Sequence, residues 1–533
     1  MANQPSDGST LGLSRTGRLT GSGIYGEQSG PVSVPALTLL HHPDLRRVGE
    51  RALLSELPLG VEVRIGRHEP EFAQPDATTG EPLSDPYISR QPLHLRPAPG
   101  GIVLSTGASR TRVVADGTPV SGDLEISAAD VDRGVVLELA GRLVLLLHSM
   151  HHLTAPSAKR FGLVGDSDGL ARVRADIRRV ADLDVSVLLR GETGTGKELA
   201  AQALHDASRR RSGPFVAVNL GAIPPTLVAS ELFGAARGAY TGSVQGQEGY
   251  FRRAQGGTLL LDEIGEANPE VQVMLLRVLE TGEVQTLGTQ TSQKVDVRVL
   301  AATDADLEAR AAAGEFRAPL LHRLAGFEIW MPPLRERRDD IGRLLIHFLR
   351  RELTAVSEAH RLETGDPSAS PWLRPELVAR LARYGWPGNV RQLRNVARQL
   401  AIGSRGMPRA EVGPAVEKLL SQAPPRSATI AEAPARGQAE RRRPSEVGEE
   451  ELMEALRACR WDLQATAAQL RISRPSLYAL IEASPRLHTA GDLKPEEIGR
   501  AFEECGGDLD AMSERLEVSR KALGRRLREM GLA

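Results

Sequence analysis

The chain has 533 residues, enough for three or four domains, and its 25% charged and 41% hydrophobic residues are ordinary for a globular protein with buried cores. A formal net charge of -1 excludes a uniformly basic nucleic-acid binder, so any DNA contact has to come from a local patch. Only Cys459 and Cys505 are present, which excludes a disulfide framework and favours a reducing compartment. Since no apolar run reaches spanning length and the N-terminus lacks an apolar signal core, we expect a cytoplasmic protein with no membrane partner.

The N-terminal third is expected to be β-rich. Residues 1–33 are rich in Gly, Ser and Thr and are expected to be disordered. Over residues 34–150, short apolar runs alternate with turns, which is typical of an all-β sandwich. The predicted strands are 37–40, 61–65, 101–104, 111–114 and 135–139.

Two segments of this region resemble the hallmark segments of the forkhead-associated (FHA) domain: Ile65-Gly66-Arg67, and Ile88-Ser89-Arg90 with the four residues that follow. The resemblance implies a phosphopeptide site at Arg67, Ser89 and Arg90, with a phosphothreonine protein or kinase as partner. The chain departs from the family at Pro92, where a His is usual. A sandwich that only packs against the rest of the protein remains the alternative.

A glycine-rich segment follows the β-prone run Val187-Leu188-Leu189-Arg190 and precedes a helical pattern. It is Gly191-Glu192-Thr193-Gly194-Thr195-Gly196-Lys197-Glu198. Strand, loop and helix in this order predict a P-loop, because the glycines let backbone N–H groups surround phosphates and Lys197 adds a positive charge between the outer phosphates. Glu198 stands where a magnesium-binding Ser or Thr is usual, so the metal is expected to use another carboxylate.

That carboxylate follows a second apolar run, 258–261, which ends in Asp262 and Glu263. Buried parallel strands deliver such side chains to the sheet edge where phosphates bind. We predict that Asp262 holds Mg²⁺ through water and that Glu263 polarises the attacking water, with ATP and Mg²⁺ as the cofactors. Strands alternate with helical stretches over residues 160–405, which predicts an α/β fold with a parallel sheet.

A loop in the same region carries two glycines around an aromatic residue and a threonine, which favours an exposed position. It is Gly238-Ala239-Tyr240-Thr241-Gly242-Ser243. With this loop and the P-loop, the chain resembles the bacterial enhancer-binding proteins, which are AAA+ activators of sigma-54 RNA polymerase and carry the signature Gly-Ala-Phe-Thr-Gly-Ala. The resemblance implies a AAA+ ATPase with a helical lid over residues 160–405, with Tyr240 and Thr241 touching sigma-54.

The same resemblance assigns further roles. Val164-Gly165 lies where the family packs the adenine, and Asp304 and Arg391 occupy the two sensor positions, with Asp304 in place of the usual Asn. Arg317 and Arg323 match arginine fingers, which stabilise the transition state at a neighbouring subunit's nucleotide. The resemblance therefore implies a homo-oligomeric ring, expected to be a hexamer.

Residues 421–448 have linker composition, and an internal repeat follows, in which residues 451–482 align with 497–528. The copies, 449–486 and 495–531, resemble the Fis-like helix-turn-helix ending of the same family, which implies binding to double-stranded DNA at upstream enhancer sites. The predicted DNA contacts are Arg474, Ser476 and Tyr478 in the first copy and Arg520, Lys521, Arg525 and Arg526 in the second. The second copy is more basic and is expected to dominate DNA affinity.

The sequence therefore predicts a sigma-54-dependent transcriptional activator that couples ATP hydrolysis to promoter opening, under control of the FHA-like region. The alternative is a phosphopeptide-gated DNA-binding regulator with a non-hydrolysing, nucleotide-locked ATPase scaffold, which Asp304 and Ser243 support. An ATP-dependent origin-binding factor would share the ATPase core and the helix-turn-helix ending, but it leaves the loop 238–243 unexplained.

Overall fold

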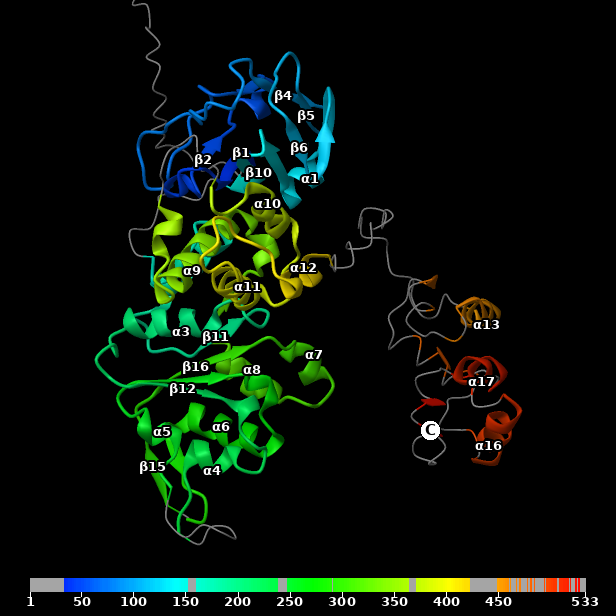
Figure 1. Ribbon diagram of the computed structural model, residues 1–533. Coiled ribbons are helices and arrows are strands. Elements are labelled where there is room, and N and C mark those ends of the chain that lie inside the picture. The colour runs from blue at the N-terminus through cyan, green and yellow to red at the C-terminus, as the bar shows by residue number, and fades with distance from the viewer. Residues whose placement is uncertain are drawn as a thin grey trace, which may run out of the picture. The chain divides into compact units, whose positions relative to one another are not determined.

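The computed structural model describes residues 33–151, 160–237, 247–289, 291–363 and 371–421, together with much of 448–527. The segments predicted to be disordered (1–33) and to act as a linker (421–448) therefore lie almost wholly outside the described residues. The chain divides into two compact units, Met1–Pro424 and Pro425–Ala533. The first contains two larger antiparallel sheets, a two-stranded antiparallel hairpin, a parallel sheet and most of the helices (Figure 1).

Residues 33–151 form two antiparallel sheets and are called the β domain here. One sheet has the order β2-β1-β10-β9-β6-β7 and the other the order β3-β4-β5-β8. The elements are β1 (Ser33–His41), β2 (Arg51–Leu53), β3 (Val63–Ile65), β4 (Leu93–Ala98), β5 (Gly101–Ser105), β6 (Val113–Ala115), β7 (Thr118–Val120), β8 (Asp123–Ser127), helix α1 (Ala128–Arg133), β9 (Val135–Leu139) and β10 (Leu143–His151). Each run predicted as a strand overlaps one of these strands.

The six-stranded sheet is buried on both faces. Successive side chains of a strand point to opposite faces. In β10, Leu145 and Leu147 pack in the core that the two antiparallel sheets share, whereas Val144 and Leu146 pack in a second core with helices from farther along the chain. This double burial explains why β10 is apolar at each position from Leu143 to Leu147 instead of alternating with polar residues.

The central region contains a five-stranded parallel sheet of order β12-β13-β16-β11-β17. Its strands are β11 (Val187–Arg190), β12 (Phe215–Asn219), β13 (Thr258–Asp262), β16 (Arg298–Thr303) and β17 (Phe327–Trp330), with a hairpin of β14 (Glu283–Gln285) and β15 (Ser292–Lys294). Side chains of α2 (Asp168–Val180) and α3 (Lys197–Asp206) cover one face. The other face is covered by α4 (Val228–Phe233), α5 (Tyr250–Arg253), α6 (Pro269–Thr281), α7 (Leu307–Ala312) and α8 (Ala318–Leu324).

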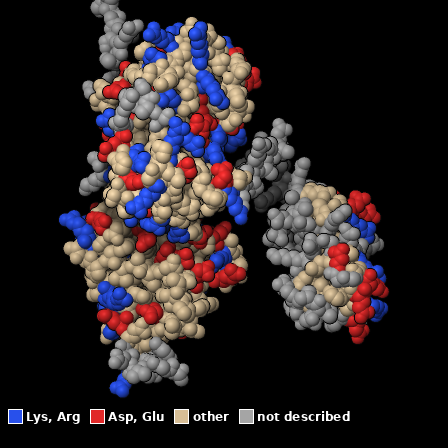
Figure 2. Space-filling model, viewed as in Figure 1, with Lys and Arg blue, Asp and Glu red and all other residues tan. Residues whose placement is uncertain are grey.

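A helical lid follows the parallel sheet. It consists of α9 (Ile341–Ala355), α10 (Pro375–Arg383), α11 (Asn389–Gly403) and α12 (Pro414–Ser421). The lid helices share their apolar core with the second face of the six-stranded sheet, and Figure 1 shows the lid between that sheet and the parallel sheet. Figure 2 shows basic and acidic side chains side by side where the β domain meets the lid. The predicted α/β fold with a parallel sheet and a helical lid is confirmed, and the N-terminal region is β-rich as predicted.

The second unit contains α13 (Glu449–Ala458), α16 (Pro495–Glu504) and α17 (Leu509–Leu516). Each copy of the sequence repeat has its own small apolar core. Equivalent positions fill the two cores: Leu452 and Leu477 in the first copy correspond to Ile498 and Leu523 in the second. Among the described residues of the whole chain, no helix combines the length and the apolar character that a membrane span requires.

His148 on β10 generates a prediction about pH. Its Nδ1–H donates to the Ser149 carbonyl (3.2 Å), so its Nε2 accepts the Thr38 hydroxyl proton (2.8 Å) and the neutral ring is satisfied. Burial, assisted by nearby Arg51, lowers the pKa of His148 from 6.5 to about 4. A depressed histidine pKa contributes stability that is complete above pH 6.5 and is lost as the pH falls towards 4.

We therefore expect the free energy of opening the β1–β10 ladder to fall by about 2 kcal/mol between about pH 7.5 and pH 5 through this histidine alone. Hydrogen exchange, corrected for the intrinsic rate at each pH, measures that free energy. The control is His148→Gln, which keeps hydrogen-bonding groups but does not titrate. An equal loss of protection in the variant would contradict the assignment.

Candidate nucleotide site

The predicted P-loop lies between β11 and α3, at the carboxyl end of the parallel sheet. Gly191, Gly194 and Gly196 have φ angles of 143°, 81° and 106°, a region that side chains disfavour. At Gly194 the space is also closed, because a Cβ there would lie 2.6 Å from the Gly388 carbonyl oxygen of the lid. The loop therefore combines the backbone freedom that phosphate binding needs with a close approach to the lid.

Lys197 begins α3, and its Nζ donates to the carbonyl oxygens of Gly191 (2.6 Å) and Glu192 (3.3 Å). Burial lowers the pKa of Lys197, while the charges of Asp304, Asp262 and Glu263 act to raise it. The fold therefore brings three predicted acids from the ends of β13 and β16 close to the P-loop lysine.

Asp262 is held by its neighbours at the end of β13. Its carboxylate accepts hydrogen bonds from Asn219 Nδ2 (3.3 Å) and from the Glu263 backbone N–H (3.1 Å). Glu263 adopts a left-handed φ of 54°, and its side chain lies over Gly221, where a Cβ would overlap it. Asn219 was not predicted as a site residue, although its place at the end of a parallel strand is a usable signal.

The lid holds the tip of the P-loop. Arg335 donates two hydrogen bonds to the Glu192 carboxylate (2.8 and 2.6 Å). These bonds are the main reason that the pKa of Glu192 is lowered. Asn389 Nδ2 donates to Glu192 Oε2 (3.0 Å) and to the Thr193 carbonyl (3.1 Å). Buried Arg337 donates to the Thr195 carbonyl (2.9 Å). The sequence predictions did not include these three lid residues.

The two predicted sensor residues also lie at the loop. Asp304 accepts a hydrogen bond from Thr193 Oγ1 (2.6 Å). The Arg391 backbone N–H donates to the Gly194 carbonyl (3.3 Å), and its positive charge acts on Lys197 by lowering that pKa. Glu198 is an exposed first-turn residue of α3.

Asp340, at the start of α9, holds Asp166 and Ser167, which directly follow the predicted adenine position Val164-Gly165 and are called the adenine segment here. Asp340 accepts hydrogen bonds from the Asp166 N–H (2.6 Å) and from the N–H and hydroxyl of Ser167 (3.0 and 2.6 Å). Gly165, which follows Val164, has a φ of 124°, and a Cβ there would overlap the Asp340 carboxylate. The position predicted for the adenine is therefore in direct contact with the lid.

Arg317 and Arg323 lie on the start and body of α8, and both are exposed. The described residues form no ion pair with either. The Arg323 carbonyl accepts a hydrogen bond from Ser186 (2.6 Å), which immediately precedes β11. Because the P-loop follows the other end of β11, a four-residue strand of about 13 Å separates Arg323 from the phosphate loop of its own chain.

In the β domain, Arg67 donates to the Ile88 carbonyl (2.8 Å) and to the Pro86 carbonyl, and so supports the loop that carries Ser89. The Ser89 N–H donates to Thr111 Oγ1 (2.9 Å), and Arg90 is exposed. The structure therefore brings the three predicted phosphopeptide residues together, beside Thr111, which was predicted as a strand residue and not as part of this site.

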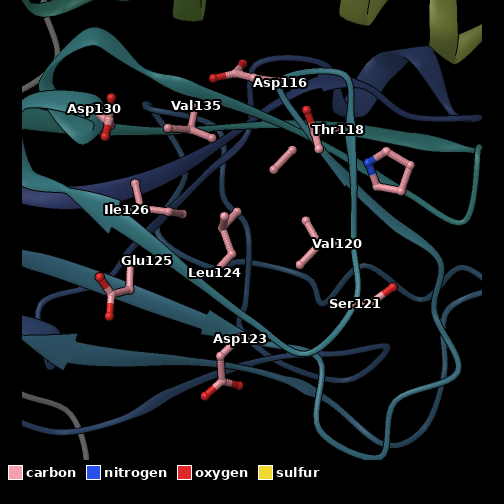
Figure 3. Close-up of a pocket in the computed structure, with 12 residues that line it drawn as sticks. Asp116, Thr118, Val120, Ser121, Asp123, Leu124, Glu125, Ile126, Asp130 and Val135 are labelled. Atoms are coloured by element: carbon pink, nitrogen blue, oxygen red, sulfur yellow. The ribbon is translucent and has the colours of Figure 1, made fainter.

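The β domain also contains a separate cavity of about 370 Å³, between β7 and β8. Figure 3 shows Val120, Leu124 and Ile126 in its lining, with the carboxylates of Asp123 and Glu125 at its edge. None of the predicted phosphopeptide residues lines it, and its acidic edge disfavours a phosphate.

Two groups of predicted residues fall largely outside the described part of the chain. The first is the sigma-54 loop, Gly238 to Ser243. The second is the DNA-contact set, of which only Arg526 is described, as a partly buried helical residue. These assignments stay predictions.

The described residues fit a nucleoside triphosphate. Positive-φ glycines, the buried amine of Lys197 and the carboxylates of Asp262 and Glu263 converge at the end of a parallel sheet, which is the chemistry of phosphate binding. The described part of the chain holds no cluster of three or more His, Cys, Asp or Glu residues suited to a metal ion. A Mg²⁺ site formed by Asp262 together with phosphates and water is compatible with that finding.

Residues 163–330 match the Sigma-54 interaction domain family, and residues 335–412 match the AAA+ ATPase lid domain family. The chain is 45% identical over 265 residues to the C4-dicarboxylate transport transcriptional regulatory protein DctD of Rhizobium meliloti (strain 1021), covering 50% of this chain and 55% of DctD. It is 45% identical over 244 residues to the DNA-binding transcriptional regulator NtrC of Escherichia coli (strain K12), covering 46% of this chain and 50% of NtrC.

A crystal structure of NtrX from Brucella abortus in complex with ADP aligns at 28% identity with a TM-score of 0.43, covering 69% of this chain and 70% of NtrX. At that TM-score the similarity adds no conclusion. The chain spans about half the length of the curated relatives it matches. The two family matches confirm the prediction of an ATPase: the central region is a AAA+ ATPase domain with its lid.

The Asn389 contacts generate a prediction about nucleotide affinity. Asn389 has a φ of 51°, so Asn389→Gly keeps the backbone conformation and removes only the side-chain bonds to Glu192, Thr193 and the Leu334 N–H. We expect the dissociation constant for ADP to rise about tenfold, because one hydrogen bond to a charged group is worth about that factor.

Titration calorimetry with the full chain measures this change. Asn268→Gly, a helix-cap substitution at α6 outside the site, is the matched control and should bind ADP as the wild type does. Wild-type ADP affinity in a folded Asn389→Gly variant would show that the lid contact does not support the loop.

Proposed function

We propose that the protein is a sigma-54-dependent transcriptional activator, in which ATP hydrolysis drives the remodelling of sigma-54 RNA polymerase at promoters. The observation that carries the proposal is the match of residues 163–330 to the Sigma-54 interaction domain, in a chain whose site residues converge at Lys197. Transcriptional regulators among the similar proteins support it.

The site residues act in hydrolysis as follows. Lys197 and the P-loop N–H groups bind the outer phosphates. Glu263 orients a water molecule and takes its proton as the water oxygen bonds to the terminal phosphorus and the bond to the ADP oxygen breaks. Asp262 would hold Mg²⁺ through water, and the ion would supply positive charge that offsets the charge on the phosphate oxygens.

Arg317 and Arg323 complete the site from a neighbouring subunit. Their exposure, and the position of Arg323 at the far end of β11 from its own P-loop, support action in trans. The protein then works as a homo-oligomeric ring. In this proposal the loop from Gly238 to Ser243 contacts sigma-54, and the C-terminal repeat binds enhancer DNA through two Fis-like helix-turn-helix units. Arg525 and Arg526 lie in the more basic unit.

The sigma-54 proposal predicts nucleotide-gated binding. The full chain should bind purified sigma-54 in the presence of ADP with aluminium fluoride, which mimics the transferring phosphate, and not with ADP alone. Thr241→Ala should lose this binding, because the hydroxyl lies in the loop proposed to touch sigma-54. Thr281→Ala, an exposed threonine at the end of α6, is the matched control.

Two outcomes separate the proposal from its alternative, the nucleotide-locked scaffold. That alternative is favoured by the bond between Asp304 and Thr193, which places an acid at the phosphate loop. ATP turnover that falls roughly 100-fold or more in Glu263→Gln supports hydrolysis and contradicts the scaffold. Turnover without sigma-54 binding in any nucleotide state would contradict the activator function.

We also propose that the β domain is FHA-like and senses a phosphothreonine protein. The convergence of Arg67, Ser89 and Arg90 supports this proposal. Arg67 already donates to backbone carbonyls, so exposed Arg90 is the better probe of phosphate binding.

We expect a phosphothreonine peptide library to be retained by the full chain over its unphosphorylated counterpart, and Arg90→Ala to reduce that retention about tenfold through loss of a charge-assisted hydrogen bond. Arg96→Ala, which removes a half-exposed arginine paired with Asp123 elsewhere in the domain, should have no effect. Equal retention of both libraries would leave the β domain as a packing module.

A further inference from the structure

The second face of the six-stranded sheet is docked on the lid. Leu40 and Val144 of the β domain share one apolar core with Ile341 and Leu345 of α9. At Gly342 the helix touches the strand directly, since a Cβ there would overlap the Leu40 carbonyl. Backbone contact of this kind leaves no room for the sheet and the helix to slide independently.

Buried polar contacts fix the same interface. Arg51 of β2 forms an ion pair with Asp339 (2.7 Å), and both side chains are about nine-tenths buried. Arg338 donates to the Gly134 carbonyl (2.6 Å) at the end of α1. Arg383 of α10 pairs with Glu138 of β9 (2.9 Å). The β domain is therefore joined to the lid by charges as well as by an apolar core.

Seven consecutive residues, Leu334–Asp340, contact both the nucleotide site and the β domain. We call them the coupling segment. Arg335 and Arg337 donate to the P-loop, at the Glu192 carboxylate and the Thr195 carbonyl. Asp340 accepts three hydrogen bonds from the adenine segment at 166–167. Arg338 and Asp339 of the same segment contact the β domain. The phosphate loop, the adenine segment and the β domain thus meet on one short stretch of chain.

We propose that the coupling segment transmits the position of the β domain to the nucleotide site, and that Arg51 is a positioning residue for the bound nucleotide. The inference rests on nucleotide binding by the ATPase domain and does not depend on sigma-54. Linkage requires the coupling to be reciprocal, so nucleotide must also strengthen the contact between the β domain and the lid.

The ion pair between Arg51 and Asp339 is the contact whose loss should most disturb the coupling segment. Burial raises the pKa values of Asp339 and Asp340, and the charge of Arg51 acts to lower both. Without Arg51, two adjacent buried carboxylates lose a compensating charge, and a buried ion left without its partner is costly. The segment relieves this by moving or by taking up a proton, and either response disturbs the bonds that Asp340 makes to the adenine segment.

The test measures ADP affinity in the full chain for Arg51→Met, Asp339→Asn and the double variant. Each single variant should weaken ADP binding about tenfold, within the usual range of coupling between sites. The double variant should be no weaker than either single variant, because both remove the same contact. Asp339→Asn preserves the side-chain shape and supplies the same comparison should Arg51→Met fail to fold.

Arg47→Met is the burial-matched control. Arg47 forms a similarly buried pair with Glu50 (2.8 Å), but its bonds stay within the β domain, at the carbonyls of Glu81, Pro82 and Leu83. It should bind ADP with wild-type affinity. Weakening as large as that of Arg51→Met would mean that any damage to the β domain has this effect, and it would overturn the proposal.

A second readout separates positioning from structural support. In the wild type, ADP should slow hydrogen exchange in β2 and β9, which lie in the six-stranded sheet and carry Arg51 and Glu138. In Asp339→Asn this ADP-dependent protection should disappear from β2. The proposal is overturned if ADP affinity is unchanged in folded variants, or if the protection of β2 persists in Asp339→Asn. Neither outcome affects the sigma-54 assays.

Discussion

The nucleotide site depends on one close approach, between the glycine turn of the P-loop and the first residues of α11. The Gly194 carbonyl accepts the Val390 N–H (3.0 Å), and Asn389 fixes Glu192 and Thr193 beside it. The partners are almost 200 residues apart in the sequence, as the separation of 197 between Glu192 and Asn389 shows. Because a long loop costs entropy to close, several polar contacts have to act together at this point.

This close contact between the P-loop and the lid also explains how much of the site could be predicted. The P-loop and the acids at the end of β13 are contiguous patterns whose chemistry depends on the backbone geometry of a few neighbouring residues, so the sequence alone was sufficient to propose them. Arg335 and Asn389 act on a loop more than 140 residues away. Nothing local distinguishes them from an ordinary surface arginine or helix-start asparagine, and only the fold brings them to the P-loop.

The sequence left open that the β domain packs against the rest of the protein, but it did not identify the lid as the partner. A signal of that docking was nevertheless present in β10. A strand with one face in solvent alternates apolar and polar residues, whereas Leu143 to Leu147 is apolar at every position. Such a run predicts a strand whose two faces are both buried. In a domain of two packed sheets, the second sheet covers only one face of that strand. The second face is buried by the lid, through Ile341 and its neighbours. The identity of that partner could not be predicted, because burial is a property of the strand and does not name what buries it.

The charges at the site bear on the proposal that a neighbouring subunit completes it. Asp262, Glu263 and Asp304 all act on Lys197, and a triphosphate adds further negative charge to the same place. Within the chain, Lys197 and Arg391 are the cations that act on this place. Arg335 and Arg337 also reach the P-loop, but Arg335 is paired with Glu192 and Arg337 donates to the Thr195 carbonyl. Asp262 would add the charge of a metal ion. Arg323 is exposed and lies at the opposite end of β11 from the P-loop. In the proposed ring, exposed Arg323 of one subunit would supply a cation to the acid-rich site of the next. If the coupling segment acts as proposed, a shift of the β domain would change how each subunit of that ring presents its nucleotide to its neighbour.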